Sequence, residues 1–65
     1  MVKLFTTHCP KCNVLEKKLK AKNIPFETIE DISEIVERGF REAPILLVEN
    51  NYMDFVSANA WVNGQ

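Results

Sequence analysis

The sequence predicts an α/β fold in which helices flank a four-stranded mixed sheet. Strand-like and helix-period segments alternate from the N-terminus. Residues 45–48 form a continuous apolar run, Ile-Leu-Leu-Val, which is typical of a central strand buried on both faces. A chain of 65 residues is expected to form one domain, residues 1–65. The expected element order is strand, helix, strand, helix, strand, strand, helix.

The first half of the chain has the pattern of a strand–helix–strand unit. Residues 2–6 favour a strand, and residues 10–22 favour a helix because apolar side chains recur there at helical spacing. Pro25 prevents the helix from continuing, and residues 26–29 favour a second strand. Two strands joined in this way are expected to run parallel, with a right-handed crossover.

A short second helix is expected after residue 31. Asp31 as the N-cap and Glu34 three residues later have the form of a capping box. Gly39 is the expected C-terminal signal of this helix.

The chain is expected to end with a hairpin and a third helix. Residues 45–48 and 52–55 would be the two strands, and residues 49–52, Glu-Asn-Asn-Tyr, would form a tight hairpin turn because asparagine tolerates positive φ. Ser57 is expected to cap a final helix that begins at residue 58.

Composition and charge are ordinary for a globular domain, with 46% hydrophobic residues, 26% charged residues and a net charge of −1. They give no reason to expect nucleic acid or a membrane as a partner. No stretch approaches the roughly 20 apolar residues of a membrane span, and the N-terminal stretch is too short for a signal peptide. We therefore expect a complete, cytoplasmic, monomeric protein.

Four lysines in residues 17–22 favour a solvated helix face, the alternative being a docking surface for an acidic partner.

Two cysteines with CxxC spacing stand where the first strand gives way to the first helix. The first amides of a helix favour negative charge, so a thiolate there has a pKa below the usual value of about 8.5. Pro10 suits the first helical turn. Cys9 is expected at the cap, exposed, with Cys12 one turn further and nearer the core. Such a pair would be a dithiol switch, since a bridge between them closes almost no loop and stabilises little.

The cysteine pair and its neighbours leave alternatives open. The pair could be inert, or it could be half of a metal site. A structural zinc site takes four protein ligands, so Cys9, Cys12 and His8 would need a second chain. His8 and Lys11 are expected to favour the thiolate by their positive charge, the alternative being solvent-exposed residues without a role.

The element order, the CxxC and the proline before residues 45–48 resemble the glutaredoxin family, which has a thioredoxin-like fold. The resemblance covers essentially the whole chain. It rests on the Cys-Pro-Lys-Cys stretch at residues 9–12 and on Glu42-Ala43-Pro44. Residues 39–41, Gly-Phe-Arg, before that proline are similar to small glutaredoxin-like redoxins that serve ribonucleotide reductase.

The resemblance implies a thiol–disulfide oxidoreductase. Cys9 would be the nucleophile and Cys12 the resolving thiol. Pro44 would be cis and lie beside the sulfurs, and the main chain of Ala43 would pair with an extended substrate. Asp54 and Phe55 fall where the family lines its substrate or glutathione groove.

Several positions depart from the glutaredoxin pattern. Lys11 replaces an aromatic residue, and Thr6 replaces a lysine that contacts glutathione. Glu42-Ala43 replaces Thr-Val, which brings a negative charge near the pocket. Asp54-Phe55 replaces Gly-Gly, and those glycines let the γ-glutamyl backbone approach. The redox chemistry therefore carries over better than the glutathione site.

The resemblance implies no tightly bound cofactor and no metal, with glutathione as a possible co-substrate. The expected partners are a disulfide-containing protein such as ribonucleotide reductase, and glutathione or a thioredoxin-reductase-type flavoprotein as the source of electrons. Two alternatives stay open. One is a redoxin reduced by the flavoprotein that donates to ribonucleotide reductase. The other is a dimeric metal or iron–sulfur carrier that uses the CxxC.

Overall fold

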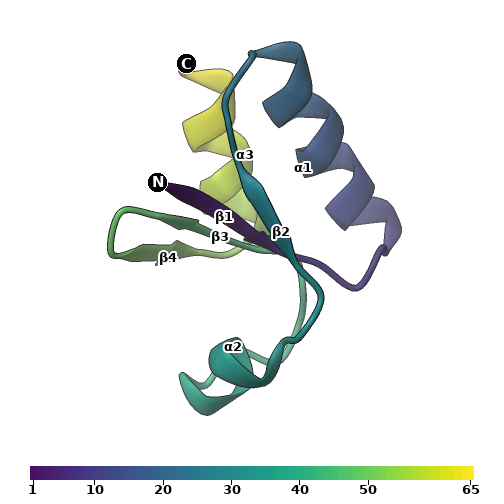
Figure 1. Cartoon of the computed structure of the whole chain (residues 1–65), viewed down its shortest axis with the longest axis vertical. Coiled ribbons are helices and arrows are strands. Elements are labelled where there is room, and N and C mark those ends of the chain that lie inside the picture. Colours follow the sequence, from purple (N-terminus) through teal and green to yellow (C-terminus); the bar gives the residue numbers. More distant parts are fainter.

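Four strands form one mixed sheet, and three helices pack on its two faces (Figure 1). The computed structural model describes residues 1–65. The elements are β1 (Val2–Phe5), α1 (Pro10–Ala21), β2 (Glu27–Ile29), α2 (Ser33–Glu37), β3 (Ile45–Val48), β4 (Asn51–Met53) and α3 (Phe55–Asn63). Their order is the predicted one. None of the helices has the length and apolar character needed to cross a membrane.

The strand order in the sheet is β2-β1-β3-β4. β1 runs parallel to β2, which confirms the predicted strand–helix–strand unit. β3 runs antiparallel to both of its neighbours, with Phe5 of β1 opposite Ile45. This pairing brings the chain that leaves β1 and the chain that enters β3 to the same edge of the sheet.

Successive residues of the central strands serve opposite faces of the sheet. Leu4 and Leu46 belong to the larger core, which α1 and α3 cover. Phe5 and Ile45 belong to a smaller core on the other face, where Ile35 of α2 covers them. Side chains alternate along a strand, so one short strand can anchor helices on both faces.

Helices α1 and α3 lie side by side and run in the same direction. At their starts the Lys11 ammonium lies 5.4 Å from the centroid of the Phe55 ring. Further along, the Lys18 ammonium donates to the side-chain oxygens of Asn59, at 2.5 Å, and Asn63, at 3.2 Å. Both helices therefore begin at the edge of the sheet where β1 ends and β3 begins.

The predicted hairpin is present, but asparagine does not supply its positive φ. The turn consists of Glu49 and Asn50, because Val48 and Asn51 already pair across the two strands. Glu49 has a φ of 56°, and neither asparagine has a positive φ. A positive φ at the first of two turn residues is the feature of type II′ hairpins.

The expected cap of α3 was wrong. Asp54, not Ser57, is the N-cap, and its side chain accepts a hydrogen bond from the Ser57 amide at 2.9 Å. The helix thus begins at Phe55, three residues earlier than predicted, and β4 ends at Met53. A carboxylate facing the free amides of the first turn also suits the helix dipole.

The expected capping box of α2 was also wrong. Asp31 lies outside the helix and accepts a hydrogen bond from the Ser33 amide at 3.0 Å. Glu34 accepts instead from the Tyr52 hydroxyl on β4. The end of the helix is as predicted, since Gly39 follows it with a φ of 95°.

Replacing Asp54 by Ala should lower the free energy of unfolding by about 1 kcal/mol, because α3 loses its N-cap. Urea denaturation of the reduced protein, followed by circular dichroism, measures this loss. Ser57→Ala is the matched control, since the backbone amide of residue 57 donates the same hydrogen bond to Asp54 whether or not the hydroxyl is present. A larger loss for Ser57→Ala than for Asp54→Ala would contradict this assignment of the cap.

Candidate functional site

The first cysteine of the CxxC is the N-cap of α1. Cys9 has an extended backbone, with φ of −73° and ψ of 165°, and Pro10 is the first helical residue, as predicted. The Sγ atom of Cys9 accepts a hydrogen bond from the Cys12 amide at 3.2 Å. The sulfur thus takes the position in which serine or aspartate oxygens usually cap helices.

The two cysteines are free thiols with different exposure. Cys9 is partly exposed, whereas Cys12 is completely buried. Their sulfur atoms lie 2.7 Å apart, so a single proton can be shared between them. The exposed sulfur also lies 3.9 Å from the main-chain oxygen of Ala43, across the edge of the sheet. This arrangement leaves one sulfur partly exposed and holds the second, buried sulfur directly behind it.

The surroundings of the pair favour a negative charge. Burial raises the pKa of the Cys12 thiol, but hydrogen bonds with the Cys9 sulfur, the Thr6 side chain and the amides of Thr7 and Cys9 outweigh burial. Together they lower the pKa of Cys12 from 9.0 to about 7. Near neutral pH, a large fraction of the protein therefore carries a thiolate at this pair.

Thr6 is a site residue that the sequence did not identify as one. Its side chain is completely buried directly after β1. The hydroxyl oxygen accepts a hydrogen bond from the His8 amide at 2.9 Å, and the same side chain bonds to Cys12. The only signal in the sequence was its place at the end of a strand just before the CxxC. It was considered there only as the residue that replaces a lysine.

His8 has a structural partner outside the CxxC. Its backbone is left-handed, with a φ of 61°, which turns the chain between Thr6 and Cys9. Its ring nitrogen Nε2 lies 3.2 Å from a carboxylate oxygen of Glu30, and both side chains are well exposed. No direct contact between this imidazole and the Cys9 sulfur supports the predicted activation of Cys9. The ring pairs with Glu30 instead.

A groove of about 340 Å³ opens beside the sulfurs. Residues 40–45 form one wall, and Lys11, Asp54 and Phe55 form the other. All four predicted groove residues lie here, and the peptide bond between Ala43 and Pro44 is cis, as predicted. The sequence placed the charge of Glu42 near the pocket, but it did not assign Phe40 and Arg41 to the groove. They come from the loop between α2 and β3, whose course depends on tertiary packing.

The groove is lined by charged residues of both signs and by apolar residues. Lys11 and Arg41 are its positive residues, and Glu42 and Asp54 are its negative ones. The Asp54 carboxylate is already used by the Ser57 amide. The groove itself therefore does not select strongly for an acidic or a basic ligand.

Comparisons of this chain with protein-family models, with curated proteins and with solved structures gave no match. Function is therefore argued from the site itself. No three His, Cys, Asp or Glu side chains gather where they could hold a metal ion. The interpretation as a metal carrier thus still needs a second chain.

The ionisation of the dithiol should follow the pKa of about 7 at Cys12. The ultraviolet absorbance of the thiolate is expected to rise with a midpoint near pH 7, rather than near 9 as for an ordinary thiol. The folded state releases the Cys12 proton near pH 7 and the unfolded state near 9. The reduced protein should therefore become more stable to urea as pH rises through that window and lose this gain as pH falls through 7. A titration midpoint near pH 9 would contradict this.

Replacing Thr6 by Val should raise the pKa of Cys12, because the buried hydroxyl is lost while the shape is kept. The ultraviolet absorbance of the thiolate, recorded against pH, measures the shift. Thr7→Val is the matched control, because Thr7 contributes its amide, which the substitution keeps. Equal titration midpoints for Thr6→Val and wild type would show that the hydroxyl has no part in ionisation.

Proposed function

We propose that this protein is a thiol–disulfide oxidoreductase of the glutaredoxin type, with a thioredoxin-like fold. The observation that carries the proposal is the pair itself. Cys9 is a partly exposed sulfur at the N-cap of α1, and Cys12 is a buried sulfur 2.7 Å behind it with a pKa of about 7. The mixed sheet and the cis bond before β3 support it by resemblance to that family.

The reaction needs no group beyond the two thiols and a disulfide. The Cys9 thiolate attacks one sulfur of the substrate disulfide, forms a mixed disulfide and releases the other substrate sulfur as a thiolate. Cys12, as a thiolate, then attacks the Cys9 sulfur. The Cys9–Cys12 disulfide forms and the second substrate thiolate leaves. The two thiol protons of the enzyme end on the two product thiols, so the substrate gains two electrons and the enzyme loses two.

The groove would hold the substrate for this attack. The main chain of Ala43 reaches to within 3.9 Å of the Cys9 sulfur, so an extended segment beside it would place its disulfide at that sulfur. Phe55 offers apolar surface at the same place. Glutathione or a thioredoxin-reductase-type flavoprotein would then restore the dithiol.

A second candidate is a redoxin that a flavoprotein reduces and that donates electrons to ribonucleotide reductase. The observation that favours it concerns Thr6. This residue occupies the position of the glutathione-binding lysine, yet it is buried and its hydroxyl is used by the site itself. Phe55 lies in the groove below the Lys11 ammonium, where the family has glycine. Both features weaken a glutathione site and leave the disulfide chemistry in place.

Two variants test the proposed roles of the cysteines. Cys9→Ser should abolish turnover of every disulfide, because no other exposed thiol exists. Cys12→Ser should abolish reduction of protein disulfides, since no second sulfur can release the mixed disulfide. It should keep reduction of a glutathione mixed disulfide, which needs only one thiol.

The assay should run two recycling systems in parallel. One contains glutathione, glutathione reductase and a small glutathione mixed disulfide, and the other contains thioredoxin reductase and a protein disulfide. Turnover in the first alone would assign a glutaredoxin, and turnover in the second alone would assign the redoxin. Turnover in neither, with both thiols free, would refute the oxidoreductase proposal.

A further inference from the structure

Charge is divided unevenly between the two parts of the chain. Residues 1–26 hold six lysines and one acidic residue, a net charge of +5. Residues 27–65 hold two arginines and eight acidic residues, a net charge of −6. The overall charge of −1 therefore conceals two strongly and oppositely charged regions.

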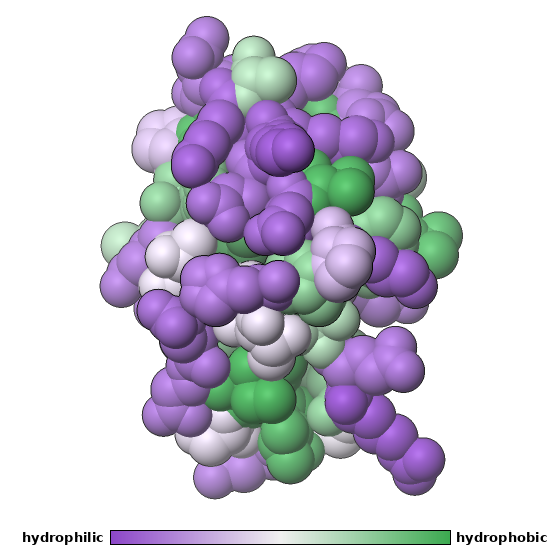
Figure 2. Space-filling view, turned by 90° about the vertical axis from the view of Figure 1, so that its right-hand side faces the viewer, coloured by the Kyte–Doolittle hydropathy of each residue, from purple (hydrophilic) through white to green (hydrophobic).

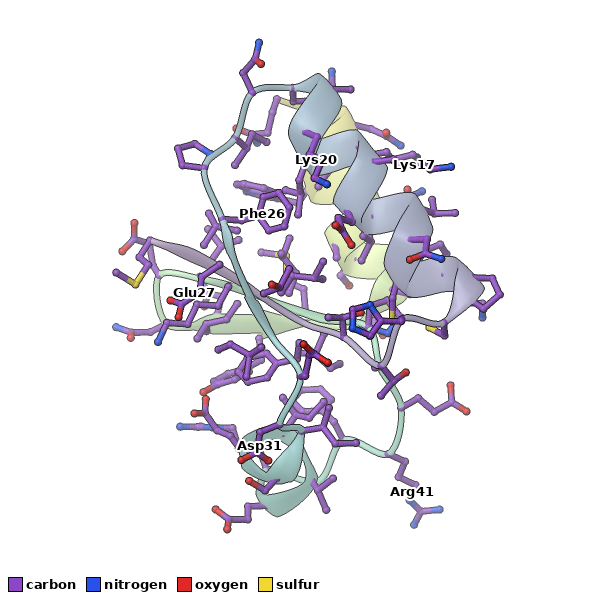
Figure 3. All side chains as sticks on the ribbon, turned by 45° about the vertical axis from the view of Figure 1, so that its right-hand side comes forward. Lys17, Lys20, Phe26, Glu27, Asp31 and Arg41 are labelled. Carbon is purple, nitrogen blue, oxygen red and sulfur yellow. The ribbon has the colours of Figure 1, made fainter.

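The fold keeps the lysines of α1 apart from the acidic residues near α2. Figure 2 faces the side on which α1 lies, and hydrophilic side chains dominate its upper half. In Figure 3, Lys17 and Lys20 project from α1 at one end of the molecule, and Asp31 lies near α2 at the other end. The longest dimension of the molecule, 29 Å, separates the lysine-rich end from the acidic end.

Most of the lysine charge on α1 is not neutralised. The chain has three ion pairs, and only one involves α1, between Lys20 and Glu16 at 3.1 Å. Lys18 donates to neutral amide oxygens of α3, which leave its charge uncompensated. Lys11 and Lys17 have no carboxylate partner.

The uncompensated lysines form one surface that begins at the groove. Lys11 lines the groove, and Val14 and Lys18 follow on the same helix face, at spacings of three and seven residues. Lys17 lies next to Lys18. We name this surface, made of Lys11, Val14, Lys17 and Lys18, the α1 ridge. Seven residues of helix span about 10 Å, and 41% of Val14 is exposed along it.

We propose that the α1 ridge binds an acidic polypeptide segment next to the disulfide of the substrate. The inference rests on the proposed oxidoreductase function and names its substrate class. The ridge attracts such a segment, and the acidic end of the molecule repels it. An acidic partner is therefore turned so that its disulfide faces Cys9. A nucleic acid fits less well, because its phosphates extend far beyond the ridge towards the acidic end.

The test uses two synthetic peptides, each with one internal disulfide. The disulfide is flanked by a run of glutamates in the first peptide and by a run of lysines in the second, and the two peptides are otherwise identical. At low salt, kcat/KM for the acidic peptide should be about tenfold higher. The difference should vanish near 1 M salt, where the Debye length is about 3 Å.

A matched pair of variants distinguishes an effect of the α1 ridge from an effect of the net charge of the protein. Lys17→Gln and Asn50→Asp both lower the net charge by one. Lys17 belongs to the ridge, whereas Asn50 is in the hairpin turn. Lys17→Gln should lower kcat/KM for the acidic peptide about twofold at low salt, and Asn50→Asp should leave it unchanged.

Each outcome decides between the inference and the proposed function. Equal reduction of both peptides by wild type would overturn the ridge and leave the oxidoreductase function standing. An equal effect of Lys17→Gln and Asn50→Asp would also overturn it, since net charge alone would then act. Competition by a single-stranded oligonucleotide as strong as by a glutamate peptide would reassign the ridge to nucleic acid. Reduction of neither peptide would refute the oxidoreductase function itself.

Discussion

The hydrogen bond from the Cys12 amide to the Cys9 sulfur joins the start of a helix to the chemistry of the site. A helix begins where a side-chain acceptor satisfies its free amides. Here that acceptor is the proposed nucleophile, so the geometry that starts α1 also fixes the position of the exposed sulfur. Because Cys12 lies one turn into the same helix, the helix also fixes the distance between the two sulfurs.

The sheet supplies the other half of the site. Phe5 and Ile45 pair across β1 and β3, so the chain that leaves one strand and the chain that enters the other share an edge. This is why Ala43 lies beside Cys9, although 34 positions separate them in the sequence. The parallel arrangement of α1 and α3 brings Phe55 to the same edge. The groove thus follows from strand pairing and from the common direction of two helices.

The sequence predicted what depends on local patterns. Element order, the place of the CxxC and the end of α2 at Gly39 follow from periodicity and from residues that stop helices. The caps failed because several acceptors compete for the same amides. Asp54 precedes Ser57 and accepts the hydrogen bond from the first turn of α3. Glu34 does not cap α2, because its carboxylate accepts a hydrogen bond from Tyr52 on β4 instead. Only the tertiary structure decides such competitions.

Helix stability explains some of the lysines of α1, but it does not explain Lys11. Lysines near the end of a helix stabilise it through the helix dipole, so Lys18 and Lys20 need no functional explanation. Lys11 stands in the first turn, where a cation opposes the dipole. It gains in return the face of the Phe55 ring, which lines the groove. The α1 ridge therefore begins at the one lysine that helix stability does not favour, two residues after the proposed nucleophile Cys9.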